Sequence, residues 1–96
     1  MIEIKPAELK IIKEILCKLV PEFEVRVFGS RVKGNTKSYS DLDLALVGAK
    51  KLDLKLKFEL KEALAESDLP FRVEILDWQT LSDDFKKIIN QKYEVI

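Results

Sequence analysis

The sequence predicts an α/β fold, a single layered domain over residues 1–96 in which helices and strands alternate. In some segments apolar residues recur every three or four positions, as on one face of a helix; in others they recur every second position, as in a strand with one buried face. At 96 residues the chain is long enough for one modest core and too short for two. The expected order is helix, strand, short helix, strand, helix, strand, helix, with no repeat or linker between them.

Five segments are expected in the first half of the chain. Residues 6–20 form a helix that has a proline in its first turn and ends before the next proline, and residues 23–28 alternate apolar and charged side chains as in a strand. Residues 29–33 form a tight turn running into a short helix, residues 34–40 form a polar loop, and residues 41–47 form a second strand. The apolar residues that define these faces are Leu9, Ile12, Leu16, Leu19, Phe23, Val25, Val27, Leu42, Leu44 and Leu46.

The second half begins with an ambiguous segment at residues 52–66. Its first half alternates like a strand, whereas its second half has apolar residues three and four positions apart. Its length, its lack of β-branched residues and its many strong helix formers favour a helix. A connector at residues 67–70 leads to a third strand at residues 71–76, and Ser82 then has the features of an N-cap, with two aspartates in the first turn of a last helix. The apolar face of that helix consists of Leu81, Phe85, Ile88 and Ile89.

The composition excludes several classes of protein. The 17 basic and 17 acidic residues cancel, so there is no global field to hold a long nucleic acid. The chain has no histidine, which excludes a Ser-His-Asp triad, a Cys-His pair and a histidine-ligated metal. The single cysteine, Cys17, cannot form an internal disulfide and is expected to be a semi-buried structural thiol. No long apolar span and no signal-peptide pattern is present, so we expect a cytoplasmic protein that does not enter membranes.

Asp41 and Asp43 open the second predicted strand. Because strand side chains alternate, these two carboxylates point to the same face, whereas Leu42 and Leu44 point to the other. Adjacent carboxylates repel each other, and a divalent cation removes that repulsion; such hard oxygen ligands suit Mg²⁺. The plainer interpretation is a strand start that uses charge to protect a sheet edge. The Gly-Ser sequence upstream favours the metal site.

Gly29, Ser30, Arg31 and Lys33 lie between the first two predicted strands. Glycine lets the backbone approach a ligand closely, and the amide groups that open a helix attract anions. In the functional interpretation, the amide and hydroxyl groups of Ser30 bind the terminal phosphates of a triphosphate, and Arg31 or Lys33 neutralises its charge. The alternative is a strand-to-helix turn with solvated basic residues. A Walker loop is excluded, because its Gly-x-x-x-x-Gly-Lys-Ser/Thr pattern is absent.

Glu74 is the candidate for a third carboxylate. By itself, a glutamate that alternates with Val73 and Ile75 is typical of the solvent-exposed face of a strand. A two-metal site, however, needs a further carboxylate from a neighbouring strand, which completes one metal's shell and takes the proton from an attacking hydroxyl group. Asp77 is a rival, but it lies three residues further on and should face the opposite side. Trp78 is expected to be a packing anchor rather than a base-stacking platform.

Taken together, these motifs resemble the signature of the DNA polymerase beta-like nucleotidyltransferase superfamily. Val27-Phe-Gly-Ser30 is followed, after ten residues, by Asp41-Leu-Asp-Leu44. Within that superfamily, Gly29-Ser-Arg-Val-Lys-Gly34 and Ser40-Asp-Leu-Asp-Leu44 resemble the minimal nucleotidyltransferase (MNT) family. Leu69-Pro-Phe-Arg-Val-Glu-Ile-Leu-Asp-Trp78 lies where that family places its third acidic strand, so the resemblance covers nearly the whole chain.

The resemblance implies an α+β arrangement, a small mixed sheet of about three to four strands flanked by helices, which binds ATP and Mg²⁺, with two ions expected. By position, Asp41 and Asp43 would hold the metals. Glu74 would be the third metal-binding and catalytic carboxylate. Gly29 and Ser30 would hold phosphate.

Two positions depart from the family pattern. The third acid of the family is typically aspartate, and Glu74 is one methylene group longer. Lys33 stands where the family often has arginine, so bidentate phosphate binding is lost there while the charge is kept.

The expected function is Mg²⁺-dependent transfer of AMP from ATP to a hydroxyl group of a partner protein. Proteins of the resembled family are commonly paired with a HEPN-domain protein, and some act as antitoxins that transfer AMP to a tyrosine of that ribonuclease toxin. At 96 residues the chain has little room to bind an acceptor by itself, which favours a separate protein. The alternatives are a non-catalytic nucleotide-binding module that inhibits its HEPN partner by contact and, more weakly, a nucleic-acid-binding domain. Whether the domain forms homo-oligomers is left open.

Overall fold

The computed structural model describes residues 2–34, 37 and 40–96. Four residues of the predicted polar loop, Asn35, Thr36, Ser38 and Tyr39, lie outside the described residues. The elements are α1 (Pro6–Leu19), β1 (Glu24–Phe28), α2 (Ser30–Lys33), β2 (Leu42–Val47), α3 (Leu54–Glu66), β3 (Val73–Asp77), the 3-10 helix η1 (Trp78–Thr80), α4 (Asp83–Gln91) and β4 (Glu94–Val95).

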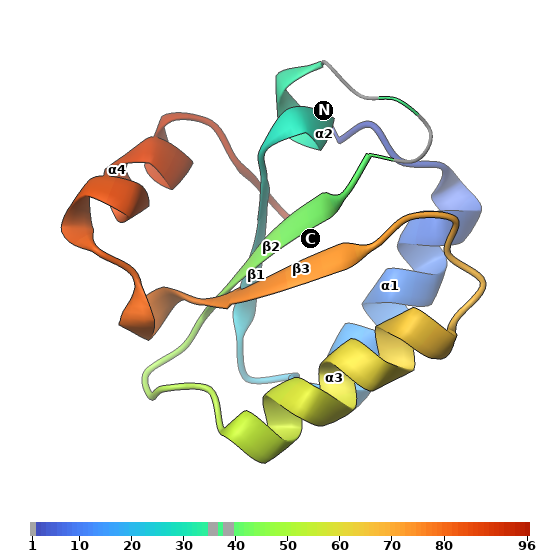
Figure 1. Cartoon of the computed structure of the whole chain (residues 1–96), viewed down its shortest axis with the longest axis horizontal. Helices are drawn as coiled ribbons and strands as arrows, with labels where there is room; N and C mark the ends of the chain where they lie inside the picture. The colour runs from blue at the N-terminus through green and yellow to red at the C-terminus, as the bar shows by residue number, and fades with distance from the viewer. Residues whose placement is uncertain (1, 35–36, 38–39) are drawn as a thin grey trace.

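The sheet is mixed and has the strand order β3-β2-β1-β4. β1 is antiparallel to both β2 and β4, whereas β2 and β3 are parallel, as expected for two strands joined through a helix. The α/β fold with a small mixed sheet flanked by helices is therefore confirmed (Figure 1). The residue pattern did not predict β4, because a strand of two residues is too short to show an alternation.

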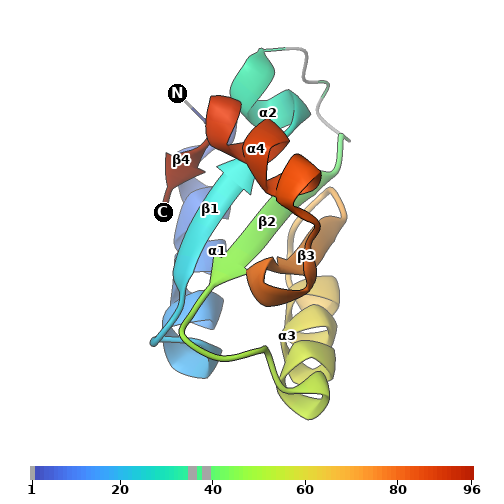
Figure 2. The ribbon, with the colours of Figure 1, turned by 90° about the vertical axis from the view of Figure 1, so that its left-hand side faces the viewer.

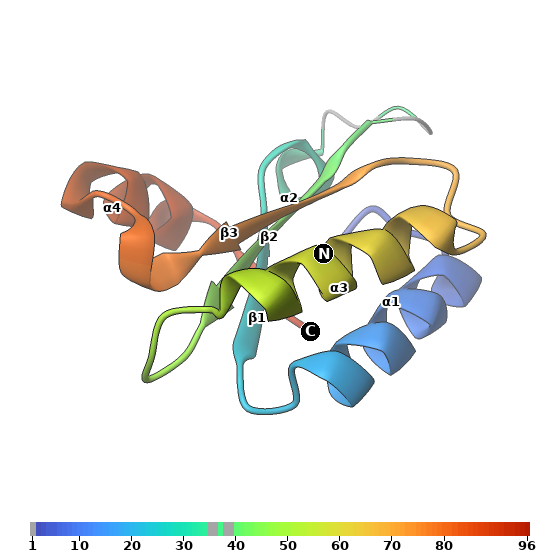
Figure 3. The same cartoon turned by 60° about the horizontal axis from the view of Figure 1, so that its bottom comes forward.

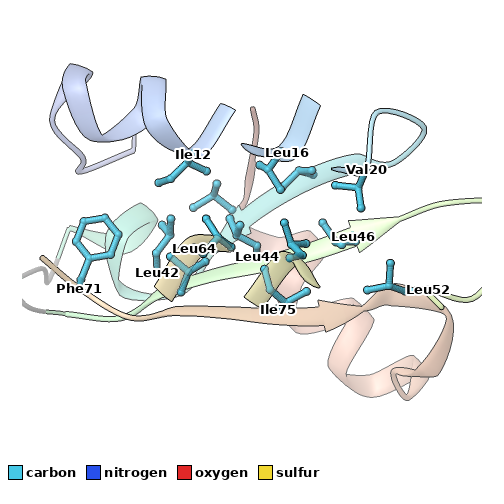
Figure 4. Close-up of a cluster of buried hydrophobic side chains, with 14 of the residues drawn as sticks. Ile12, Leu16, Val20, Leu42, Leu44, Leu46, Leu52, Leu64, Phe71 and Ile75 are labelled. Atoms are coloured by element: carbon cyan, nitrogen blue, oxygen red, sulfur yellow. The ribbon is translucent and has the colours of Figure 1, made fainter. Parts of the chain in front are cut away.

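Helices cover both faces of the sheet. α1 and α3 lie side by side against one face (Figure 3), and α4 lies on the opposite side, over β1 and β2 (Figure 2). The core fills the space between the sheet and the α1/α3 layer; Ile12 and Leu16 of α1 and Leu64 of α3 point toward Leu44 of β2 (Figure 4). Among the described helices, none is long and apolar enough to cross a membrane.

The ambiguous segment forms a helix, as its composition favoured, although α3 begins at Leu54 rather than at residue 52. Asp53 is the N-cap, and its side chain accepts a hydrogen bond from the Lys55 amide at 3.3 Å. Leu52 is buried just before the helix, and its amide donates to Oδ2 of Asp77 at 2.9 Å. A cap and a buried leucine therefore set the start of α3.

One expectation for the helices was wrong: Cys17 is exposed, not semi-buried. At about 100° per residue it lies about 140° around α1 from Ile12, well away from the apolar stripe. In α4 only Ile89 is buried, while Phe85 and Ile88 are 38% and 56% exposed. The expected apolar face of α4 is thus wider than the part of it that packs on the sheet.

Candidate active site

Asp43 lies on the face of β2 that is turned away from the core, and Asp41 directly precedes β2, which begins at Leu42 rather than at residue 41. Leu42 and Leu44 have no exposed surface, whereas Asp41 and Asp43 are half-buried. In the sheet, Asp43 is the register partner of Glu74 on the parallel strand β3. Register partners project to the same face of a sheet, so acids far apart in the sequence become neighbours.

A basic residue links the acids of the two strands. Arg72, which directly precedes β3, places its Nη2 3.4 Å from Oδ2 of Asp41 and its Nε 3.2 Å from Oε1 of Glu74. The Arg72 side chain is 73% exposed. Its backbone is fixed, because its carbonyl accepts a hydrogen bond from the Leu42 amide at 2.9 Å. The guanidinium group therefore lies between two of the three predicted metal ligands.

Asp43 lies in the most strongly negative part of the site. Partial burial raises the pKa of its carboxyl group above the ordinary value, and the charges of Asp41 and then Glu74 raise this pKa further. Both charge effects require the three carboxylates to lie close to one another. This is the electrostatic environment in which a divalent cation is favoured.

Gly29 brings the backbone directly against Asp43. It has φ 85° and ψ −154°, a conformation that residues with a side chain rarely adopt. A Cβ atom at this position would collide with Oδ2 of Asp43. The Gly29 carbonyl accepts hydrogen bonds from the amides of Val32 and Lys33, both at 3.1 Å, so the chain turns at once into α2. The glycine is thus required both by its conformation and by the space that the carboxylate occupies.

Ser30 and Lys33 are the first and last residues of α2. Ser30 is half-buried beside Gly29, and its carbonyl accepts the Gly34 amide at 3.1 Å. Lys33 is exposed one turn further along the chain. In Figure 1, α2 follows the end of β1 at the edge of the sheet where β2 begins. The predicted tight turn and short helix are confirmed, and they lie next to the acidic side chains.

Arg31 differs from the role expected for it. Its side chain is buried, with 3% exposed surface, and donates to the Glu3 carbonyl at 2.7 Å and to the Ser40 carbonyl at 2.9 and 3.1 Å. Its guanidinium group also lies over the ring of Phe71 at 4.0 Å. Through these contacts Arg31 links Glu3 in the N-terminal segment, Ser40, which precedes Asp41, and Phe71, which lies two residues before β3. The structure thus favours Arg31 as a positioning residue that fixes the site from behind, rather than as a ligand of the triphosphate.

Asp77, the rival to Glu74, faces the opposite side of β3, as predicted. It is 6% exposed, and its two carboxylate oxygens accept the amides of Leu52 and Gln79 at 2.9 and 3.1 Å. Its carboxylate is therefore used to hold the chain after β2 and after β3. Trp78 lies 4.8 Å beneath the guanidinium group of Arg26, an arrangement that fits the expected packing anchor.

The acids have the chemistry of a magnesium site. Asp41, Asp43 and Glu74 supply hard oxygen ligands, and a positively charged group, the Arg72 guanidinium, already contacts two of them. Within residues 2–34, 37 and 40–96, no three side chains of the metal-ligating types are yet arranged to hold a metal ion. The carboxylates would have to close around a bound cation.

A groove of about 650 Å³ opens beside Arg72 and Glu74. It runs between α3 and β3, which is the edge strand of the sheet on that side. Its lining is mainly apolar and includes Phe58, Leu69 and Phe71, with Arg72 and Glu74 at one end. Glu74 and Arg72 therefore border a hollow large enough to take a substrate group.

Comparison with known proteins identifies the relatives of the chain. Residues 9–96 match the family model described as nucleotidyltransferase domain. A protein from Haemophilus influenzae, named probable protein adenylyltransferase MntA, is 55% identical over 95 residues, which cover 99% of this chain and 83% of that protein.

Solved structures with similar folds include two toxin–antitoxin assemblies. A toxin–antitoxin structure with AMP-PNP has a TM-score of 0.76 at 26% identity, covering 90% of this chain and 69% of that one. A complex of a tri-AMPylated Shewanella oneidensis HEPN toxin with an MNT antitoxin has a TM-score of 0.66 at 30% identity, covering 92% of this chain and 66% of that one.

Proposed function

Because this chain belongs to the nucleotidyltransferase domain family, we propose that it transfers AMP from ATP to a hydroxyl group of a partner protein, a HEPN toxin. The observation that carries the proposal is the meeting of three carboxylates: Asp43 of β2 is in register with Glu74 of β3 and in contact range of the Gly29 backbone, and Asp41 directly precedes β2. On a sheet face that binds no ligand, the repulsion among these carboxylates would only destabilise the protein.

The relatives support the group that is transferred and its acceptor. One relative is named a protein adenylyltransferase, and one structural neighbour is a complex with an AMPylated HEPN toxin. Another neighbour contains AMP-PNP, an analogue of ATP. We accordingly assign ATP as the substrate and an antitoxin role to this chain, and we place the reaction in the cytoplasm, where ATP is available.

The metal in this proposal is Mg²⁺, held by Asp41, Asp43 and Glu74. Three carboxylates suffice for two ions, because Mg²⁺ usually takes one or two protein carboxylates and completes its shell with water and phosphate oxygens. When bound, Mg²⁺ supplies the positive charge that offsets the triphosphate and the departing pyrophosphate.

The other steps use side chains of this chain. Glu74 takes the proton from the acceptor hydroxyl, whose oxygen forms a bond to the α-phosphorus of ATP. The bond from that phosphorus to the bridging oxygen of the β-phosphate breaks, and pyrophosphate leaves with the bonding electron pair. Gly29 and Ser30 bind phosphate oxygens at the start of α2, and Lys33 contributes charge at its end. Arg31 positions this turn through the carbonyl groups of Glu3 and Ser40.

The proposal is tested with ATP labelled at the α-phosphate, Mg²⁺ and a purified HEPN protein from the source organism. Wild type is compared with Asp43→Asn, which removes the central carboxylate, and with Asp84→Asn, which removes one exposed carboxylate in α4. Asp43→Asn should lower protein labelling at least about a hundredfold, since even groups that only support metal ligands contribute tenfold to a hundredfold. Asp84→Asn should label the partner as wild type does.

Two results would reject the proposed function. Efficient labelling of a small molecule together with no labelling of protein would make the chain a small-molecule adenylyltransferase. If Asp43→Asn neutralised the toxin as well as wild type does, and neither of these two proteins transferred label, the chain would be a contact inhibitor that has kept the fold.

A further inference from the structure

Arg72 contacts two of the carboxylates to which the proposed function gives the metal. On the basis of that function, we propose that Arg72 is a built-in counter-cation, which occupies Asp41 and Glu74 in the metal-free protein and leaves them when metal and nucleotide bind together. The residue thereby controls the order in which the site is loaded.

The contacts of Arg72 define this role. One guanidinium group reaches two carboxylates, Oδ2 of Asp41 just before β2 at 3.4 Å and Oε1 of Glu74 in β3 at 3.2 Å. Within the described chain, both ion pairs recorded for Arg72 are thus with proposed metal ligands. A cation that binds these oxygens has to compete with the guanidinium group.

Arg72 is also free to move in a way that two other arginines are not. The Arg26 side chain is 18% exposed and lies against the rings of Trp78 and Tyr93, and Arg31 is buried against Phe71. The Arg72 side chain is 73% exposed, so it can swing into solvent without opening a cavity. Its backbone stays fixed by the hydrogen bond from Leu42, so the motion is confined to the side chain.

The displaced guanidinium group then has a partner only if nucleotide is present. Guanidinium groups bind phosphate oxygens through two parallel hydrogen bonds. A free Mg²⁺ ion must break the Arg72 ion pairs and offers nothing in return, whereas a Mg²⁺–nucleotide complex brings phosphate oxygens to the same place. Arg72 therefore favours binding of the metal with its nucleotide over binding of the metal alone.

The test measures binding of Mn²⁺, as a probe for Mg²⁺, to the purified chain by electron paramagnetic resonance, with and without AMP-PNP. Four variants are compared with wild type: Arg72→Gln, Arg72→Lys, Asp43→Asn and Lys10→Gln, which removes an exposed charge from α1 on the far side of the sheet. Circular dichroism and the melting temperature in EDTA verify that each variant is folded.

Arg72→Gln should bind Mn²⁺ alone about three- to tenfold more tightly than wild type, the range expected when one or two exposed ion pairs no longer compete. The additional tightening by AMP-PNP should be smaller in Arg72→Gln than in wild type. Arg72→Lys, which keeps the charge but loses the fork of donors, should fall between them, and Lys10→Gln should match wild type.

Other outcomes separate this inference from the proposed function. Equal Mn²⁺ affinity in wild type and Arg72→Gln, with binding abolished in Asp43→Asn, would overturn the role of Arg72 and keep the metal site. Weaker binding in Arg72→Gln would overturn it as well, because Arg72 would then orient the carboxylates for the metal. Full binding in Asp43→Asn would instead reject the acidic site itself.

Discussion

The two faces of β2 have opposite effects on the folded protein. Leu42, Leu44 and Leu46 alternate along one face, have no exposed surface and form the middle of the core (Figure 4). Asp41 and Asp43 alternate with them on the other face, where burial and then the charges of Asp41 and Glu74 raise the pKa of the Asp43 carboxyl group. The difference shows that a single strand provides both stability and the proposed chemistry, and that the acids are kept despite their mutual repulsion.

The largest difference in stability is expected between substitutions of two adjacent residues of β2, one on each face of the strand. Leu44→Ala should lower the free energy of unfolding by about 3 kcal/mol, because it leaves a cavity in a closely packed core. Asp43→Asn should leave the free energy of unfolding in EDTA unchanged or raise it, because it removes the central repelling charge. Urea denaturation followed by circular dichroism measures both values.

In the assay of AMP transfer, the same two variants should show the reverse: the substitution that destabilises the fold should keep activity, and the other should lose it. Leu44→Ala should keep its labelling rate per folded molecule at low temperature, whereas Asp43→Asn should lose it. A loss of stability in Asp43→Asn as large as that in Leu44→Ala would break the comparison, because the acid would then be a structural residue.

Two glycines with positive φ, Gly29 and Gly34, allow the cost of backbone strain to be separated from the cost of a steric clash with Asp43. Gly29 and Gly34 have φ of 85° and 91°, but a Cβ atom would meet Asp43 at the first position and no atom of the described residues within 4 Å at the second. Gly29→Ala should therefore lower the free energy of unfolding by about 2 kcal/mol and Gly34→Ala by about 1 kcal/mol, since the second carries only backbone strain.

Only Gly29→Ala should also affect the site. It forces the Asp43 carboxylate to shift, and a displacement of about 1 Å can lower a rate about a hundredfold. Labelling assays and Mn²⁺ binding of the two variants test this. Equal losses of transfer in both would show that the turn matters only through its backbone conformation.

A smaller effect is expected for a carboxylate on the core face of β3. Asp77→Asn should lower the free energy of unfolding by about 1.5 kcal/mol, because an amide group cannot accept both the Leu52 and the Gln79 hydrogen bonds. Glu74→Gln, on the opposite face of the same strand, should change stability little while it abolishes labelling. Chemical denaturation of the two variants sharpens the division between the faces, and a Glu74→Gln variant as unstable as Asp77→Asn would contradict it.

Much of this arrangement follows from local sequence, and the remainder depends on contacts between distant segments. Strand alternation correctly predicted that the two aspartates face away from the core and that Asp77 faces away from Glu74, because a period of two fixes the face. The burial of Arg31 could not be predicted in this way, because its partners Glu3 and Phe71 are 28 and 40 positions away. Arg72 was missed because a basic residue two positions before an acid gives no sign that it also reaches Asp41, 31 positions away in the sequence.

The smallest effect is the pH dependence of stability in the absence of metal. The pKa of Asp43 is raised in the folded protein, mainly by burial and then by Asp41 and Glu74, so the folded state holds this proton more tightly than the unfolded chain does. Stability therefore falls as the pH rises from the ordinary aspartate pKa through the raised pKa, and the Asp43 contribution to the fall is under about 1 kcal/mol for a partly exposed group. Melting temperatures of wild type and Asp43→Asn across this range in EDTA isolate that contribution, because the other carboxylates titrate in both proteins. In EDTA the difference should favour Asp43→Asn increasingly as the pH rises, and saturating Mg²⁺ should reverse it, because the metal binds and stabilises the folded wild type. A difference in EDTA that grows in favour of wild type would mean that the ionised Asp43 is stabilised by its surroundings, and the contrast between the faces of β2 would not hold.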